Sequence, residues 1–330
     1  MSARTFLSSS TLISVLLGLP CVASEAEITI CRGMCDASAV MPVGAEHFVV
    51  ADDEDNILRV YSRTKGGAPV QTFDLEPFLR VARKSPEVDL EGSARIGDRV
   101  YWISSHGRNK DGKLRPNRHR FFATTISSTD GKIEIQPSGK PYADLLNDLL
   151  REPRLKEFNL AAAAQLAPKE KNALNIEGLC DTPEGHLLIG FRNPNPNGKA
   201  LIVPLLNPDE LIAGQGQSAR FGDPVMLELG GLGIRSMARA GNRYFIIAGS
   251  YDGKGRSQLY EWSGGGESPR QLPHPELRSL NPEAIEVISE NGRARLFVVS
   301  DDGTMKIGGI DCKDVKDANL KYFRATMLDL

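Results

Sequence analysis

The sequence repeats a layout in which short apolar runs alternate with polar turns. Five apolar runs are rich in β-branched or aromatic residues and are bounded by Gly, Asp, Asn or Ser, which is typical of β-strands. These runs are 47–50, 100–103, 186–189, 244–247 and 296–299. Further strand candidates follow them at 57–61, 121–126, 201–205 and 258–262. The pattern therefore predicts hairpins that recur about every 50 to 60 residues.

Recurring hairpins of this kind predict an all-β fold, a β-propeller in which each blade is a small four-stranded sheet. Five blades fit the five repeats, and six fit if one repeat has diverged. The exposed edge of the last blade needs a partner strand, and the segment 27–31, which lies before the first repeat, is expected to supply it and close the ring. A two-sheet sandwich is the alternative architecture for the same strands.

One repeat interval is longer than the others, and its excess lies at about 141–168. Leu145, Leu146, Leu149 and Leu150 have helical spacing there, and the alanine run 161–164 is a strong helix former. Pro153 is expected to separate two short helices. The sequence therefore predicts a helical insertion between the second and third blades.

The first 24 residues resemble an export signal. Arg4 precedes an apolar run at 6–19, and the small residues Ala23 and Ser24 offer a cleavage point. The run is too short to span a bilayer, and no later stretch is long and apolar enough to do so. We therefore expect a secreted or periplasmic protein without a membrane span, with residues 25–330 forming a single propeller domain.

Charge and cysteine content agree with an exported globular protein. The chain has 40 Lys and Arg against 42 Asp and Glu, a balance that gives no support for a nucleic-acid partner. Four cysteines follow the export signal, which suggests disulfides in an oxidising compartment but allows three pairings. Cys31 with Cys35 would close a tight loop, and Cys31 with Cys312 would tie the chain ends together. Free buried cysteines, Cys180 among them, are the alternative.

Each repeat opens with an acidic residue or an arginine that is followed by a small residue. These opening residues are Asp36, Glu91, Glu177, Arg235 and Glu283. If each opens the innermost strand of its blade, the five side chains surround one mouth of the central channel. The small residue that follows fits this interpretation, because strands crowd together near the axis.

Four carboxylates and one arginine at one mouth require compensation by a bound cation, by protonation or by basic groups. Oxygen ligands in a flexible arrangement favour Ca²⁺. Asp89, Asn175 and Asn281, two positions before three of the opening residues, are candidates for further oxygen ligands. The alternative is that these carboxylates only accept hydrogen bonds from the backbone of neighbouring blades.

A basic loop at 104–120 is expected on the same face. It contains His106, Arg108, Lys110, Lys113, Arg115, Arg118 and Arg120, with Asp111 as its only acid. In an antiparallel hairpin the start of the first strand and the end of the second lie together, so this loop and the turn at Arg192 and Asn193 approach the acidic mouth. The helical insertion could cover it as a lid.

Arginine forks suit an anionic ligand such as a phosphate, although a charged surface loop that is only solvated is the alternative interpretation. Aspartates in the turns after the apolar strands are interpreted as turn formers: Asp52, Asp252, Asp301 and Asp302.

Five segments around the opening residues and the basic loop carry distinctive motifs: Asp89-Leu90-Glu91-Gly92, Trp102-Ile103-Ser104-Ser105-His106-Gly107, Asn175-Ile176-Glu177-Gly178-Leu179, Gly190-Phe191-Arg192-Asn193-Pro194 and Asn281-Pro282-Glu283-Ala284. In these segments the sequence resembles a bacterial family, domain of unknown function 3616. The resemblance extends from about Cys35 to the C-terminus and implies no settled activity. More distantly, the repeated Glu-Gly is similar to esterase-like or phytase-like secreted propellers, which implies phosphoester hydrolysis with Ca²⁺.

Two functional hypotheses follow. In the first, the channel mouth binds a small anionic ligand and hydrolyses a phosphoester. Its cation would be held by Asp36, Glu91, Glu177 and Glu283, its anion by Arg108, Arg118, Arg192, Asn193 and Arg235, and its proton supplied by His106, with Glu91 and Glu177 also catalytic. In the second, the protein is a non-catalytic binding or assembly module that docks a peptide, glycan or protein partner at the cell envelope.

The sequence lacks the motifs of several other hydrolases. It has no Gly-x-Ser-x-Gly elbow, His-Glu-x-x-His helix, P-loop, EF-hand loop or dinucleotide fingerprint. Serine-triad, zinc-protease and nucleotide-hydrolysing functions therefore have no local support.

Overall fold

Four-stranded antiparallel sheets succeed one another along the chain. The computed structural model describes residue 1 and residues 27–129, 131–290 and 292–330, so the predicted export signal at 1–24 lies almost wholly outside the described residues. Within them, the strands form five units of the same design.

In the first four units the strands follow in sequence order from the inside of the ring outward. The first unit is β2 (Ala37–Val43), β3 (His47–Asp52), β4 (Ile57–Ser62) and β5 (Gly66–Asp74). The second is β6 (Leu90–Ile96), β7 (Arg99–Ser104), β8 (Phe121–Thr129) and β9 (Lys132–Tyr142). The third is β10 (Asn175–Asp181), β11 (Leu187–Asn193), β12 (Ala200–Leu205) and β13 (Val225–Leu227). The fourth is β14 (Gly233–Ala240), β15 (Arg243–Gly249), β16 (Gln258–Trp262) and β17 (Arg270–Leu272).

The fifth unit combines both ends of the described chain. It consists of β18 (Pro282–Glu290), β19 (Arg293–Ser300), β22 (Tyr322–Asp329) and β1 (Ile28–Arg32). Strand β1 pairs antiparallel with β22, with Ile28 opposite Thr326 and Arg32 opposite Tyr322. The expectation that the segment 27–31 closes the ring is therefore confirmed. A single parallel bridge from Cys31 to Gly67 also joins β1 to β5 of the first unit.

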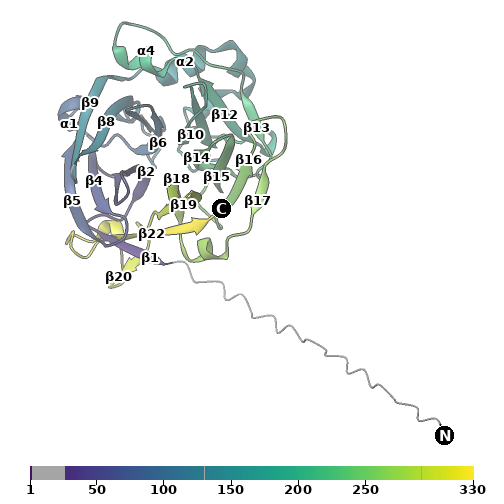
Figure 1. The fold of residues 1–330 in the computed structure, drawn as a ribbon. Helices are drawn as coiled ribbons and strands as arrows, with labels where there is room; N and C mark the ends of the chain where they lie inside the picture. The colour runs from purple at the N-terminus through teal and green to yellow at the C-terminus, as the bar shows by residue number, and fades with distance from the viewer. Residues whose placement is uncertain (2–26, 130, 291) are drawn as a thin grey trace.

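The inner strands β2, β6, β10, β14 and β18 contact one another in a closed cycle, with β18 packed against β2. Figure 1 shows the units arranged around a common axis. The fold is therefore an all-β propeller, and the two-sheet sandwich is excluded.

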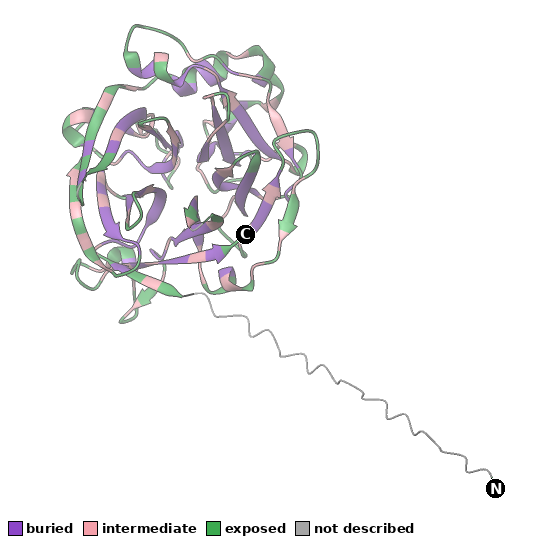
Figure 2. Cartoon of the chain, viewed as in Figure 1, coloured by how far each residue is buried: buried purple, intermediate pink, exposed green. Residues whose placement is uncertain are grey.

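The hydrophobic core lies between neighbouring units (Figure 2). Strand β7 shows how the sequence produces it: Trp102 packs into the cluster shared with the first unit, and Tyr101 and Ile103 pack into the cluster shared with the third. Successive side chains of a strand point to opposite faces, and both faces are covered here. This explains why the second strands have continuous rather than alternating apolar sequence.

The predicted helical insertion lies between β9 and β10. It contains α2 (Leu145–Arg151), η2 (Pro153–Phe158) and α3 (Leu160–Ala163), and Pro153 opens η2 as the predicted break. The remaining short elements are α1 (Glu76–Leu79), η1 (Pro116–Arg118), η3 (Pro196–Gly198), α4 (Pro208–Ala213), η4 (Pro275–Ser279), β20 (Lys306–Ile307), β21 (Ile310–Asp311) and η5 (Cys312–Asp314). No helix among the described residues has the length and apolar character needed to cross a membrane.

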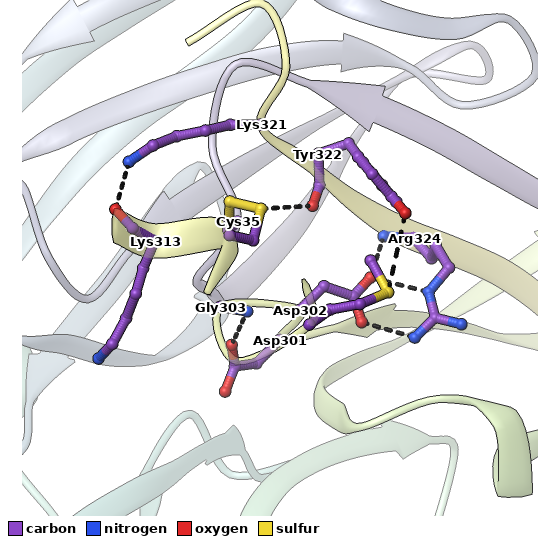
Figure 3. Close-up of a disulfide and its surroundings, with 10 residues drawn as sticks. Cys35, Asp301, Asp302, Gly303, Lys313, Lys321, Tyr322 and Arg324 are labelled. Atoms are coloured by element: carbon purple, nitrogen blue, oxygen red, sulfur yellow. Dashed lines mark hydrogen bonds and ion pairs between the residues drawn. A yellow bond between two sulfur atoms is a disulfide. The ribbon is translucent and has the colours of Figure 1, made fainter. Parts of the chain in front are cut away.

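One disulfide joins Cys35 to Cys312, with 6.0 Å between the Cα atoms (Figure 3). Cys31 and Cys180 are buried and free. Neither pairing that we considered for Cys31 is therefore formed. The disulfide ties the segment before β2 to η5.

Candidate functional site

A β-bulge near the start of each inner strand positions the candidate site residues. In every unit the pairing of the inner strand with its neighbour skips one residue. The skipped residues are Ser38, Glu91, Glu177, Arg235 and Glu283. A bulge bends its strand and redirects the side chain, so these five residues occupy equivalent positions at the channel mouth.

Asp36 is not equivalent to the three glutamates, contrary to our expectation. Ser38 occupies the bulge of the first unit, and Asp36 lies two residues before it. Asp36 therefore corresponds to Asp89, Asn175 and Asn281 of the other units. The expected ring of four carboxylates at one level is wrong, because Asp36 belongs to the next level toward the mouth.

The small residues after the bulges are explained by the close approach of neighbouring units. A Cβ on Gly178 would lie 2.7 Å from Ile234 Cγ2 of the fourth unit. A Cβ on Gly92 would lie 3.0 Å from the carbonyl oxygen of Glu177 in the third unit. Both distances leave no room for a side chain, as expected for strands that converge on the axis.

A cavity of about 700 Å³ occupies this mouth. Of the described residues that line it, ten are acidic and seven are basic. The acidic residues are Asp36, Asp53, Glu54, Glu87, Asp89, Glu91, Glu170, Glu177, Glu283 and Asp301. The basic residues are Lys110, Arg115, Arg118, Lys169, Arg192, Arg235 and Lys313. The cavity thus combines side chains of all five units with the basic loop and the end of the helical insertion.

Glu91, Glu177 and Glu283, which we call the glutamate cluster, meet at the floor of the cavity. Each offers a carboxylate oxygen within 4.8 Å of the others. All three side chains are buried, and Glu177 is only 2% exposed. Three carboxylates from three separate units therefore converge, because equivalent bulges direct them toward the axis.

Two arginines partly neutralise this cluster. Arg192 Nη1 donates to Glu177 Oε1 at 2.5 Å, and Arg235 Nε donates to Glu283 Oε1 at 3.1 Å. Glu177 Oε2 is buried without a hydrogen-bond partner among the described residues, and its nearest paired cation is Arg235 Nε at 3.8 Å. An orphaned oxygen at the meeting point of three carboxylates is the arrangement that an oxygen-seeking cation would complete.

Burial perturbs the titration of these groups. Desolvation, followed by the charges of Glu177 and Asp89, raises the pKa of Glu91 well above its ordinary value. Desolvation and the neighbouring charge of Arg192 lower the pKa of Arg235 to about 10, so the guanidinium stays protonated at neutral pH. The glutamate cluster and its arginines are therefore buried groups whose charges interact strongly.

A second acidic group, Asp36, Asp53 and Glu54, lies in the first unit, and its oxygens are also within 4.8 Å of one another. Desolvation, then Asp301 and Glu54, raises the pKa of Asp36 to about 7. Sequence reasoning missed Asp53 and Glu54 as site residues. The signal was present, because both directly follow β3 and strand ends share the face of the bulges.

Asp301 forms the expected turn, because its Oδ1 accepts from the Gly303 amide at 2.9 Å, and it also lines the cavity. Of the other three aspartates interpreted as turn formers, Asp52 and Asp252 accept hydrogen bonds within their turns, and Asp302 forms an ion pair. Asp52 Oδ1 accepts from the Glu54 amide at 2.9 Å, and Asp252 Oδ1 accepts from the Lys254 amide at 3.0 Å. Asp302 is paired with Arg324 at 2.6 Å.

The predicted anion-binding arginines are already engaged with carboxylates. Arg118 forms an ion pair with Asp89 at 2.8 Å and another with Glu87. With Arg192 and Arg235 paired as described, the three guanidinium groups serve first to hold acidic side chains in place. Direct recognition of an anion by these three forks is therefore not supported.

The additional oxygen ligands expected for a cation are also largely occupied. Asn281 Oδ1 accepts from Arg235 Nη1 at 2.7 Å, and Asp89 Oδ2 accepts from the Ser105 hydroxyl. Asn175 directs its amide nitrogen to Glu177 Oε1 at 2.7 Å. These three residues position the charged groups around the cavity.

Arg108 and Asn193 lie outside the cavity lining and fasten the end of the helical insertion. Arg108 Nε donates to the carbonyl of Ala164 at 2.8 Å. Asn193 Nδ2 donates to the carbonyls of Pro168 and Glu170, at 3.1 and 2.7 Å. They thereby hold the segment 167–170 at the cavity, which is a positioning role rather than the predicted contact with a ligand.

His106 is buried beside the cavity rather than in it. Its Nδ1 lies 2.8 Å from the carbonyl of Ser104, and its ring stacks on His119. Desolvation and the charge of His119 lower the pKa of His106 to about 3, so the imidazole is neutral at neutral pH. The expectation that His106 donates a proton to a bound ligand is therefore wrong, because the ring does not line the cavity and because it is neutral at neutral pH.

Three basic residues of the described lining have no carboxylate partner, and all three are more exposed than the glutamate cluster. Lys110 and Arg115 come from the basic loop, and Lys169 comes from the segment that Asn193 fastens. None of the three takes part in an ion pair among the described residues. The buried carboxylates of the glutamate cluster therefore share the cavity with unpaired basic side chains that are nearer to solvent.

Comparison with known families gives a match at residues 36–120 and 123–301 to a family described as protein of unknown function, DUF3616. The chain belongs to this family. The matched residues include every bulge residue and the whole basic loop, so the site described above is built by the family region of this DUF3616 chain. No curated protein matches the sequence.

Several solved structures are similar in shape. A mutant sialidase of Trypanosoma rangeli with trans-sialidase activity is 13% identical, with a TM-score of 0.42 over 89% of this chain and 54% of that one. A PQQ-bound aldose sugar dehydrogenase of Streptomyces coelicolor is 10% identical, with a TM-score of 0.42 over 92% and 98%. A GH43 β-1,3-galactosidase bound to galactodeoxynojirimycin is 11% identical, with a TM-score of 0.47 over 89% and 90%. The chain spans about half the length of that sialidase, and these likenesses do not bear on ligand or activity.

Proposed function

We propose that this protein binds a divalent cation, most suitably Ca²⁺, at the glutamate cluster and through it a small anionic ligand, with hydrolysis of a phosphoester as the reaction. The observation that carries the proposal is the convergence of three buried carboxylates within 4.8 Å, with Glu177 Oε2 left without a hydrogen bond. Oxygen ligands of this kind favour Ca²⁺ over softer metals.

The charges of the cavity support an anionic ligand that lies between a cation at the glutamate cluster and the unpaired basic side chains of the lining. Arg118, Arg192 and Arg235 are paired with carboxylates. Among the described residues that line the cavity, unpaired positive charge for an anion therefore remains at Lys110, Arg115 and Lys169. A phosphate held between these three side chains and a cation would have positive charge on both sides, which would compensate its negative charge.

The chain's own residues suggest how a reaction could proceed. A cation bound at the cluster would polarise a phosphoryl oxygen and lower the pKa of a water molecule. Glu91 is the glutamate of the cluster that forms no ion pair with a described residue, whereas Glu177 and Glu283 are paired with arginines. With a cation beside it to stabilise its carboxylate form, Glu91 would accept the proton of the water. Lys110, Arg115 and Lys169 would hold the phosphoryl group.

An export location accompanies this proposal. The Cys35–Cys312 disulfide is compatible with an oxidising compartment, where such bonds persist. A secreted or periplasmic protein would also meet Ca²⁺ at concentrations that occupy weak sites.

The test is a thermal unfolding measurement with Ca²⁺ and with chelator, followed by a substrate screen. We expect Ca²⁺ to raise the melting temperature of the wild type by clearly more than that of Glu177→Gln. Glu134→Gln, which changes an exposed glutamate on β9, is the matched control. No shift at millimolar Ca²⁺ in the wild type refutes the cation site.

Phosphate esters and carboxylic esters are then screened with the wild type and with the double variant Glu91→Gln, Glu177→Gln. Phosphoester hydrolysis that is lost in the double variant supports catalysis at the cluster. Hydrolysis that survives places the reaction elsewhere, and Ca²⁺ binding without any hydrolysis favours the non-catalytic binding module.

A further inference from the structure

We infer that the cavity contains a second site for a divalent cation of the Ca²⁺ type, formed by Asp36, Asp53 and Glu54 and distinct from the glutamate cluster. The three residues belong to the first unit alone. Asp36 precedes β2, and Asp53 and Glu54 follow β3. The inference does not depend on whether the glutamate cluster binds a cation.

The spacing of the oxygens fits a calcium ion. One oxygen of each carboxylate lies within 4.8 Å of the other two. Ca²⁺ binds oxygen at about 2.3–2.6 Å, so any two of its ligands are at most about 5 Å apart. The three carboxylates can therefore reach a common ion without rearrangement of the backbone.

Buried oxygens without partners point to the same site. The Asp36 side chain is only 7% exposed, lines the cavity and has no hydrogen-bond or ion-pair partner in the part of the chain that the structure describes. Asp53 Oδ1 is also buried with no hydrogen bond to any described residue. Burial of a carboxylate without a partner is costly, and a cation would supply the missing interaction.

Among the described residues, no protein cation forms an ion pair with Asp36 or Asp53, and one pairs with Glu54. Lys313 pairs with Glu54 at 3.1 Å, and it is the basic residue of the cavity lining that reaches this group. Asp301, which is paired with Asp36 in an isolated β-bridge, adds a further negative charge. This contrasts with the glutamate cluster, where Arg192 and Arg235 oppose three carboxylates.

The backbone next to Asp36 is fixed by a disulfide and by backbone hydrogen bonds, and Figure 3 shows the disulfide at Cys35 with Asp302, Gly303 and Lys313 nearby. The disulfide joins Cys35, the residue before Asp36, to Cys312, the residue before Lys313. The amide of Asp302 donates to the carbonyl of Cys35 at 2.9 Å, and the amide of Lys313 donates to the carbonyl of Gly303 at 3.0 Å. The site is thereby held on rigid supports rather than on a free loop.

Gly303 is required for the position of Asp36. A Cβ on Gly303 would lie 1.8 Å from Asp36 Oδ1 and 2.6 Å from its Cγ. Gly303→Ala must therefore displace the Asp36 carboxylate, and it does so without adding or removing a charged group.

The experiment is calorimetric titration of the chelator-treated protein with Ca²⁺ alone. We expect two bound ions per wild-type chain. Asp36→Asn should remove one, or weaken it at least tenfold, and leave the other unchanged. Glu177→Gln should affect only the ion that remains in Asp36→Asn.

Two further variants keep the test decisive if Asp36→Asn folds poorly. Glu54→Gln alters a side chain that is 52% exposed, and Gly303→Ala moves Asp36 without a change of charge. Both should weaken the same ion at least tenfold. Gly266→Ala, at a glycine whose Cβ would meet no atom within 4 Å, is the control and should bind as the wild type does.

The outcomes separate this site from the glutamate cluster. A single ion that is lost in Glu177→Gln and unaffected by Asp36→Asn, Glu54→Gln and Gly303→Ala overturns the second site and leaves the first. A single ion with the opposite pattern supports the second site and removes the cation from the proposed function. No bound ion at all overturns both.

Discussion

Removal of the Cys35–Cys312 disulfide should destabilise the protein by an amount that its position in the sequence determines. The two cysteines are 277 residues apart, so the bond closes most of the folded chain into one loop. In the chain-entropy model a loop of this length lowers the entropy of the unfolded state by about 19 cal/mol/K, or about 5–6 kcal/mol at 25 °C. Since native domains are stable by about 5–15 kcal/mol, Cys35→Ser/Cys312→Ser should lose a large part of the total.

The measurement is urea unfolding of the chain from residue 25 onward, oxidised and in chelator, compared with the double variant. We expect a lower midpoint and a larger m-value for the variant, because its unfolded state is no longer held compact. Added reductant should bring the wild type to the stability of the variant and should leave the variant unchanged.

A loss below about 1 kcal/mol would refute the reasoning, because it would mean that the unfolded chain ends stay together without the bond. A large loss with an unchanged m-value would also contradict it. The destabilisation would then arise from native contacts at Cys35 and Cys312 rather than from the unfolded ensemble.

Three other variants test the description of the site and of the ring. Arg192→Met leaves Glu177 buried without its guanidinium and should cost about 3–5 kcal/mol by urea unfolding in chelator, with part of the loss recovered on addition of Ca²⁺. Burial, followed by a neighbouring aspartate, raises the pKa of Glu286 from 4.5 to about 8, so its contribution to stability is full below pH 4.5 and is lost as the pH rises through 8. Glu286→Gln should therefore flatten the pH dependence of unfolding between these values and be more stable than the wild type at pH 9, by at most about 5 kcal/mol; a parallel pH dependence would contradict this. Gly178→Ala forces a methyl group to 2.7 Å from Ile234 and should cost about 1–3 kcal/mol in the same assay, whereas a neutral effect would show that the neighbouring units can separate.

The architecture could be predicted because the pattern that specifies it is local and repeated. Apolar runs such as 100–103 are buried on both faces, and their spacing gave the hairpins and the closing strand at 27–31. The helical insertion was visible for the same reason, since Leu145 and Leu149 carry a helical period and are buried.

The register of the first unit could not be predicted with equal accuracy. Asp36 before Ala37 fits the pattern of an acidic residue followed by a small one, while Ser38 before Ala39 offers a second polar residue followed by a small one. The bulge decides between them, and it depends on pairing with β3 rather than on the residues themselves.

The partners of the charged residues were also beyond the sequence. Arg118, Arg192 and Arg235 looked equally suited to a ligand or to a neighbouring carboxylate, and only the geometry shows that each is paired. His106 illustrates the same limit, because its burial arises from packing against His119 rather than from its place in a basic loop.

The pairing of β1 with β22 has a consequence for how the protein reaches its folded state. Ile28 is paired with Thr326, so β1 must wait for a segment 298 residues later (326 − 28) before its hydrogen bonds can form. If the chain crosses a translocation pore starting from its N-terminus, β1 emerges first and its partner β22 emerges last. The final sheet, and with it the barrier to proteolysis, would then be completed only after nearly the whole polypeptide has crossed. A truncation before Tyr322 should leave both β1 and β19 with open edges prone to association.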